Sequence, residues 1–139
     1  MAKTTSVSLD ALNIKAKCED AINVPYLDES GQETGIVLKV IGAHAQKVQE
    51  FVNRKMNERR RQEAMQAKRG KADEVRKIED DIEFGVQFIS MRIVGWTGIT
   101  EECTPDNALK LCQINPQVIE QVKEASENLA NFTKNSKSA

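Results

Sequence analysis

The chain has 139 residues, of which 29% are charged, 40% hydrophobic and 4% aromatic, and its formal net charge is -1. This length suits a single domain, and the hydrophobic content excludes a wholly disordered chain. Residues 1–17 have no apolar secretory core, and no segment approaches the roughly 20 apolar residues of a membrane-spanning helix. Three cysteines without a C-x-x-C pair favour a reducing compartment over structural disulfides. We therefore expect one soluble, cytoplasmic domain over residues 1–132 and a disordered tail over residues 133–139.

Two β-strands are predicted in the first third of the chain. Apolar and polar residues alternate over residues 22–26, which is typical of a half-buried strand, and Pro25 restricts this strand to a sheet edge. The run IVLKVIG over residues 36–42 has the β-branched content of a second strand. The polar segment 28–35 between them predicts a β-hairpin. Such a hairpin must pack on helices, because an isolated one is only marginally stable.

Two long helices are predicted next. Residues 43–69 contain no Pro or Gly, and their apolar stripe occupies only the first half, so the second half should project into solvent. After Gly70, apolar residues step by three or four positions through residues 75–93. We expect Gly95 and Gly98 to end this second helix.

Two further helices begin with N-terminal signals. Thr104 and Pro105 form an N-cap followed by a proline in the first helical position, and Asn115 and Pro116 repeat the pattern. The last helix should run to about Phe132. Together the segments predict a mostly α, or α+β, fold in which an N-terminal β-hairpin packs on about four helices, two of them long.

The only tryptophan lies between the two glycines that should end the second long helix. Trp96 follows an Ile-Val pair and precedes Ile99. Such apolar neighbours are typical of a core residue, whereas a ligand-stacking Trp usually has polar neighbours. We interpret it as the keystone between the third and fourth helices, with an interface hot spot as the alternative. The predicted keystone set comprises Gly95, Trp96, Gly98, Ile99, Thr104, Pro105, Pro116 and Phe132.

The charge of the chain is unevenly distributed. Residues 54–71 carry eight basic and two acidic residues, a local charge of +6, so the rest of the chain carries -7. Phosphate binding, a solvated helix face and head-to-tail electrostatic self-association are all compatible with this segment. The asymmetry favours self-association, and the absence of aromatic residues in the segment weakens the nucleic-acid interpretation. The candidate self-association surface comprises Arg54, Lys55, Arg59, Arg60, Arg61, Lys68 and Arg69.

Catalytic patterns are lacking in the sequence. It has no nucleotide-binding or nucleophile-elbow motif, and its single histidine, His44, lies far in sequence from Cys103 and Cys112. The two cysteines flank a predicted helix start, where the pKa of a thiol can fall, but we interpret them as small buried hydrophobes. We expect no enzymatic activity, no cofactor and no metal site.

Taken in order, several segments resemble those of tail assembly chaperones of long-tailed bacteriophages. The segments are SGQETGIVLKVIG, VGWTGI, TPDNALKLC, INPQVIEQV and NLANF, and the resemblance covers about residues 28–132. Asp106 stands where this family more often has Glu, and EEC shortens the loop before the helix start. The matching residues are Gly31, Gly35, Ile36, Val94, Gly95, Trp96, Gly98, Ile99, Thr104, Asn107, Ala108, Leu111, Pro116, Asn131 and Phe132.

The resemblance implies a non-enzymatic protein that acts in the host cytoplasm, has no membrane partner and is absent from the finished virion. Its implied partners are further copies of itself in a ring or spiral, the tape measure protein and, in addition, tail tube subunits. Two alternatives come from other classes of protein. One is a structural minor tail or head–tail connector protein of the virion, and the other is a small nucleic-acid-binding regulator that uses residues 54–71.

Overall fold

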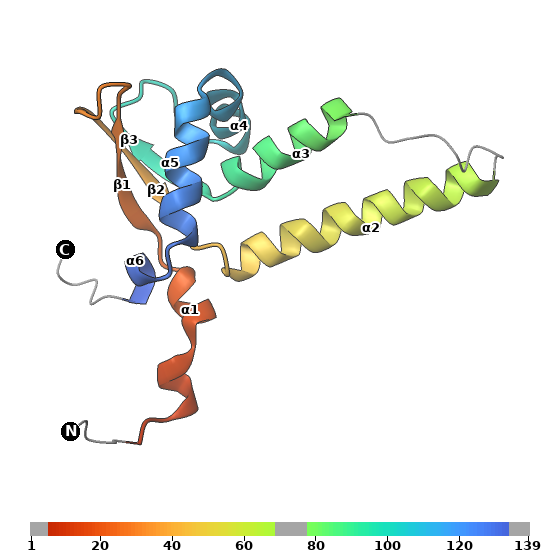
Figure 1. Cartoon of the computed structure of the whole chain (residues 1–139), viewed down its shortest axis with the longest axis horizontal. Helices are drawn as coiled ribbons and strands as arrows, with labels where there is room; N and C mark the ends of the chain where they lie inside the picture. The colour runs from red at the N-terminus through yellow and green to blue at the C-terminus, as the bar shows by residue number, and fades with distance from the viewer. Residues whose placement is uncertain (1–5, 69–77, 134–139) are drawn as a thin grey trace.

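The computed structural model describes residues 6–68 and 78–133, which form an α+β fold (Figure 1). An antiparallel sheet packs against helices that follow it in the chain. The predicted disordered tail lies outside the described residues except for Thr133, which ends the last short helix. The elements are a 3₁₀-helix η1 (Leu9–Leu12), α1 (Ile14–Cys18), β1 (Ile22–Leu27), β2 (Glu33–Val40), α2 (Gln46–Lys68), α3 (Ile78–Ser90), β3 (Ile93–Thr97), α4 (Pro105–Ile114), α5 (Pro116–Glu127) and α6 (Ala130–Thr133).

The predicted hairpin is present and gains a third strand. The strand order is β1-β2-β3, with antiparallel pairing throughout, and Leu38 in the central strand pairs with Val24 on one side and Trp96 on the other. Pro25 lies in the edge strand β1, as the sequence predicts. The side chain of Gln121 on α5 closes the end of this edge, since it accepts from the Leu27 amide at 3.0 Å and donates to the Leu27 carbonyl at 2.8 Å.

The prediction for residues 90–98 is wrong. Helix α3 ends at Ser90, and the segment that was expected to finish the helix and then stop at glycines is strand β3. Ile89 and Ile93 are four positions apart and both buried in one cluster, but a turn separates them, so the helical spacing arises from two elements that face the same core. The β-branched Ile-Val pair at the start of β3 favours a strand once β2 is available to pair with it.

Helix α2 has the two-part character that the sequence predicts. Val48 and Phe51 are its buried residues and lie in its first half, whereas its second half projects away from the sheet (Figure 1). Helix α3 packs beside the proximal part of α2. Residues 69–77, which join the two helices and include Arg69 and the predicted helical position Val75, lie outside the described residues. No helix in the described part of the chain is long and apolar enough to cross a membrane.

The capping predictions are confirmed at both helix starts. The Thr104 hydroxyl accepts from the Asn107 amide at 3.1 Å, and the Asn115 side chain accepts from the Gln117 amide at 3.0 Å. The single last helix is instead two helices, because the Asn128 side chain accepts from the Ala130 amide at 3.1 Å and so ends one helix and begins the next. A side-chain bond of this kind offers the backbone an alternative to the helical ladder.

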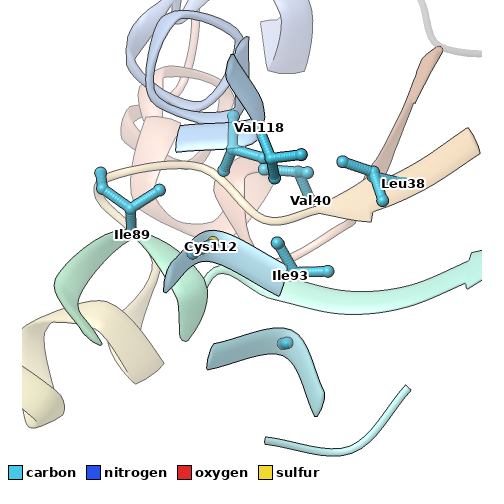
Figure 2. Packing of buried hydrophobic residues seen from close by; sticks show 8 residues of the cluster. Leu38, Val40, Ile89, Ile93, Cys112 and Val118 are labelled. Carbon is cyan, nitrogen blue, oxygen red and sulfur yellow. The ribbon is translucent and has the colours of Figure 1, made fainter. Parts of the chain in front are cut away.

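The core consists of two clusters on either side of the end of β2. The larger one joins the sheet to α3, α4 and α5, and in Figure 2 its labelled side chains converge from these elements. The smaller one joins α1 and α6 to the start of α2. The larger cluster contains Leu38, Val40, Ile89, Ile93, Ala108, Cys112, Val118 and Val122, and the smaller one contains Cys18, Ile41, Ala45, Val48 and Phe132.

Candidate functional site

Trp96 forms one wall of an apolar groove of about 360 Å³. It lies in strand β3 and is half-buried, not in a hinge between helices as its flanking glycines suggest. Its indole N–H donates to the Glu101 carbonyl at 2.8 Å, which fixes the loop that leads to α4. We call this the tryptophan groove; its main apolar lining residues are Tyr26, Ile36, Trp96, Ile99, Leu111 and Ile114.

Tyr26 links the tryptophan groove to the junction between α4 and α5. Its hydroxyl accepts from the Asn115 side-chain amide at 2.9 Å and donates to the Gln117 side-chain carbonyl at 3.1 Å. Both partners flank the proline that starts α5, so strand β1 and the two helices are held in one arrangement. The groove is therefore a preformed surface rather than a gap between independent elements.

The predicted keystone residues do not form one cluster. Gly98 and Ile99 follow β3 beside Trp96, and Pro105 and Pro116 start two helices. Phe132 lies in the other core cluster, with Cys18 and Ile41.

A second groove, of about 550 Å³, lies between α2, α3, β3 and the start of α4. Apolar side chains line it, and exposed charged residues of both signs accompany them. We call it the α2–α4 groove. Its apolar lining comprises Phe51, Met91, Ile93, Val94, Cys103 and Leu109, and its exposed charged residues are Lys47, Glu50, Arg54 and Asp106.

Three stacked phenylalanines join α2 to α3, an arrangement that the sequence analysis missed. The ring centroids of Phe51, Phe84 and Phe88 are 6.0–6.3 Å apart, with interplanar angles of 5–18°. The Arg59 guanidinium lies 4.8 Å above Phe84, and that of Arg92 lies 4.4 Å above Phe88. The spacing of four between Phe84 and Phe88 is the only sequence signal for this stack.

The stack divides the predicted basic surface into two parts. Arg54 and Lys55 lie 5.5 and 5.8 Å from the Phe51 ring, and Arg59 forms an ion pair of 3.1 Å with Asp81 on α3. Arg54 and Lys55 thus contact a ring of their own helix, whereas Arg59 links α2 to α3. Arg60, Arg61 and Lys68 are exposed, whereas Arg69 lies outside the described residues.

Acidic residues gather on α5. Glu120, Glu124 and Glu127 follow each other at helical spacings of four and three, and all three are exposed. Glu127 also lies 3.8 Å from the buried Arg92 guanidinium, whose pKa is lowered by burial. Lys123 is exposed among these glutamates, so the face is acidic in net charge, opposite to the projecting half of α2.

The cysteine thiols are in environments that suppress reactivity. Burial raises the pKa of Cys18 and of Cys103, and it raises the pKa of Cys112 to about 12. Desolvation outweighs any effect of the helix start on these thiols, and Cys112 is a small buried core residue, as interpreted from the sequence. The described residues contain no group of three or more His, Cys, Asp or Glu that could hold a metal ion.

Comparison with known families identifies the family of this chain. The model of the phage tail assembly chaperone family matches residues 1–131, and the chain belongs to this family. The sequence finds no significant match among curated proteins or solved structures. The family model covers the larger core cluster, both grooves and the projecting helix, and it covers the smaller cluster except for Phe132.

Proposed function

We propose that this phage tail assembly chaperone self-associates and binds the tape measure protein during tail assembly, without enzymatic activity. We further propose that it acts in the host cytoplasm, contacts tail tube subunits as well, and is not retained in the virion. Family membership supports the assembly role. The observation that carries the binding proposal is the α2–α4 groove, because it combines an apolar lining with charges of both signs.

The α2–α4 groove suits a helical segment of the tape measure protein. An amphipathic helix binds such a groove by burying its apolar face, while its flanking charges meet charged residues at the rim. Lys47 and Arg54 supply positive charge here, and Glu50 and Asp106 supply negative charge. Met91 adds a flexible apolar side chain that can adapt to different occupants.

The proposed self-association uses the opposite charges on α2 and α5. Arg60 and Arg61 are exposed on the projecting half of α2, and Glu120 and Glu124 are exposed on α5. Because the two surfaces lie on different elements, one copy can present its basic helix to the acidic helix of the next. Such a heterologous contact generates a ring if the rotation closes and a helical spiral if it does not.

Co-expression with the tape measure protein tests this proposal. A tagged wild-type chain should retain the tape measure protein on an affinity resin. Val94→Asp places a charge in the groove at a side chain that is 41% exposed, so the fold should survive while capture falls at least about tenfold.

Ile82→Asp is the matched control, because Ile82 is 62% exposed on α3 and does not line the groove. This variant should capture the tape measure protein as wild type does. Equal capture of the tape measure protein by both variants would show that the α2–α4 groove is not its binding site. Failure of the wild-type chain to capture the tape measure protein would overturn the proposal itself.

A further inference from the structure

Residues 6–17 form an arm whose apolar side chains are left uncovered by the rest of the fold. Leu9 is 87% exposed and Leu12 is 64% exposed. They begin and end the 3₁₀-helix η1, in which residues three apart lie one above the other, so both leucines are on one face. Val7 is exposed as well. Contiguous exposed apolar groups of this kind mark an interaction site.

The base of this arm is fixed to the body of the protein. Cys18 is fully buried, and its carbonyl accepts from the Gly42 amide at 2.9 Å. The backbones approach so closely that a Cβ at Gly42 would lie 2.5 Å from the Cys18 sulfur. At the next turn outward, the Asn13 side chain accepts from the Ala16 amide at 3.0 Å and caps α1. In Figure 1, α1 and the 3₁₀-helix η1 before it extend away from the sheet and its covering helices.

The tryptophan groove opens at the opposite end of the molecule. The groove is built from the start of β2, the end of β3 and helix α4. The base of the arm, at Cys18, instead contacts Gly42 just after the end of β2 (Figure 1). Ile114, at the end of α4, is 69% exposed beside the groove. The arm and the groove therefore point away from each other within one copy, and contact between them requires a second copy or a large rearrangement.

The arm and the groove also match in charge. The arm carries the acidic Asp10 beside Leu9 and the basic Lys15 after Ile14. The groove has one exposed residue of each sign, Lys110 and Glu101. Lys17 adds a second basic group at the base of the arm, where its ammonium donates to the Ala11 carbonyl at 3.5 Å. Both surfaces thus carry acidic and basic groups around an apolar centre, so opposite charges can be paired when the leucines dock.

We infer that Leu9 and Leu12 of one copy occupy the tryptophan groove of the next copy. This inference rests on the proposed self-association and names an apolar contact for it. The donor and acceptor surfaces differ, so the contact is heterologous and each added copy exposes a new arm and a new groove. The apolar contact supplies binding that salt does not screen, in addition to the charged contact between α2 and α5.

Disulfide trapping between two tagged copies tests the inference directly. One copy carries Leu9→Cys and the other Ile114→Cys, both in a Cys103→Ser background that removes the partly exposed native thiol. Mixing under mild oxidation should give a disulfide-linked pair that contains both tags. Leu9→Cys mixed with Ile82→Cys is the control and should give none, since Ile82 is similarly exposed but does not line the groove.

Sedimentation of Leu12→Asp provides the second measurement. Because Leu12 is exposed, the variant should fold. Loss of the docked leucine should weaken self-association and raise its Kd at least about tenfold. Absence of the mixed disulfide in a wild-type-like assembly would overturn the arm contact and leave self-association standing. In a chain that carries both Leu9→Cys and Ile114→Cys, a disulfide formed only within one chain would also overturn the inference, because the arm would then occupy its own groove. A wild-type chain that stays monomeric at all concentrations would overturn both proposals.

Discussion

Gly98 lies directly against the backbone of Gly35, and this contact joins the end of β3 to the start of β2. A Cβ at Gly98 would lie 2.8 Å from the Gly35 carbonyl oxygen and 3.0 Å from the Ile36 Cα. Both glycines have φ of +88°, a conformation that other residues rarely adopt. The GI pairs in TGIVLKV and VGWTGI therefore meet in space, although they are far apart in the sequence.

Gly98→Ala should lower the free energy of unfolding by about 2–4 kcal/mol, because it adds a backbone clash to the cost of positive φ. Gly35→Ala is the matched control, since Gly35 has the same φ but its Cβ would meet nothing within 4 Å. It should cost only about 1–2 kcal/mol. Urea denaturation of both variants checks the prediction. Equal losses of stability would show that the close approach of the two strands is unimportant.

Trp96→Ala should destabilise the fold by about 2–4 kcal/mol, because half-burial of the indole still removes much apolar surface from water. Trp96→Phe should cost less, about 1–2 kcal/mol, since a smaller aromatic ring remains in place of the indole, although the bond to the Glu101 carbonyl is lost. Thermal unfolding followed by circular dichroism measures both effects. If Trp96→Ala unfolds like wild type and loses only self-association, Trp96 is an interface hot spot and not a structural keystone.

Replacing both Arg60 and Arg61 by Gln should weaken self-association at low salt, and high salt should weaken wild type in the same way. Charges on exposed side chains are screened over roughly 10 Å at 0.1 M salt, and Gln supports the helix nearly as well as Arg. Sedimentation velocity at two salt concentrations measures the effect. Wild-type assemblies in the variant at low salt would exclude the basic contact. Tight duplex-DNA binding by wild type, lost in the variant, would favour the nucleic-acid-binding regulator instead.

Arg59→Gln should behave differently from the Arg60 and Arg61 double variant, although the residues are adjacent. Arg59 pairs with Asp81 and lies over the Phe84 ring, so its loss should loosen α3 from α2 within one chain. We expect a loss of stability of about 1–2 kcal/mol, measured by urea denaturation, because a cation–π contact and a partly exposed ion pair disappear together. A Tm equal to that of wild type, combined with weaker self-association, would place Arg59 on the intermolecular surface.

The thiol of Cys112 makes stability depend on alkaline pH. Burial raises its pKa to about 12 in the folded protein, above the ordinary value of 9.0 that applies to the unfolded chain. The unfolded chain therefore loses this proton first, and the contribution to stability is complete below pH 9 and disappears progressively as the pH rises toward 12. Urea denaturation at pH 7 and pH 10 should show a larger decrease for wild type than for Cys112→Ala. Identical decreases would contradict the assignment.

The local signals in the sequence predict local structure well. The caps at Thr104 and Asn115, the edge position of Pro25 and the two-part helix α2 each follow from a short stretch of chain. Strand β3 could not be predicted in this way, because its pairing partner is β2, more than fifty residues earlier in the sequence. The helical spacing of Ile89 and Ile93 concealed a turn between two elements that face one core.

The candidate surfaces depend even more on tertiary structure. The charge of residues 54–71 is visible in the sequence, but only the fold shows that Arg59 packs on Phe84 whereas Arg60 and Arg61 are exposed. The tryptophan groove combines residues from three strands and α4, and the sequence offers no spacing that would bring Tyr26 and Ile114 together. Leu9 and Leu12 could equally be core residues when judged from the sequence. Only the fold shows that they are exposed.

The most direct test of the central claim asks where the protein is found at the beginning and at the end of tail assembly. Quantitative mass spectrometry should detect it together with the tape measure protein in affinity-purified complexes from infected cells. The same measurement on purified virions should detect the tape measure protein without the chaperone. Stoichiometric amounts of this protein in purified virions would contradict the account and identify a structural tail or connector protein instead.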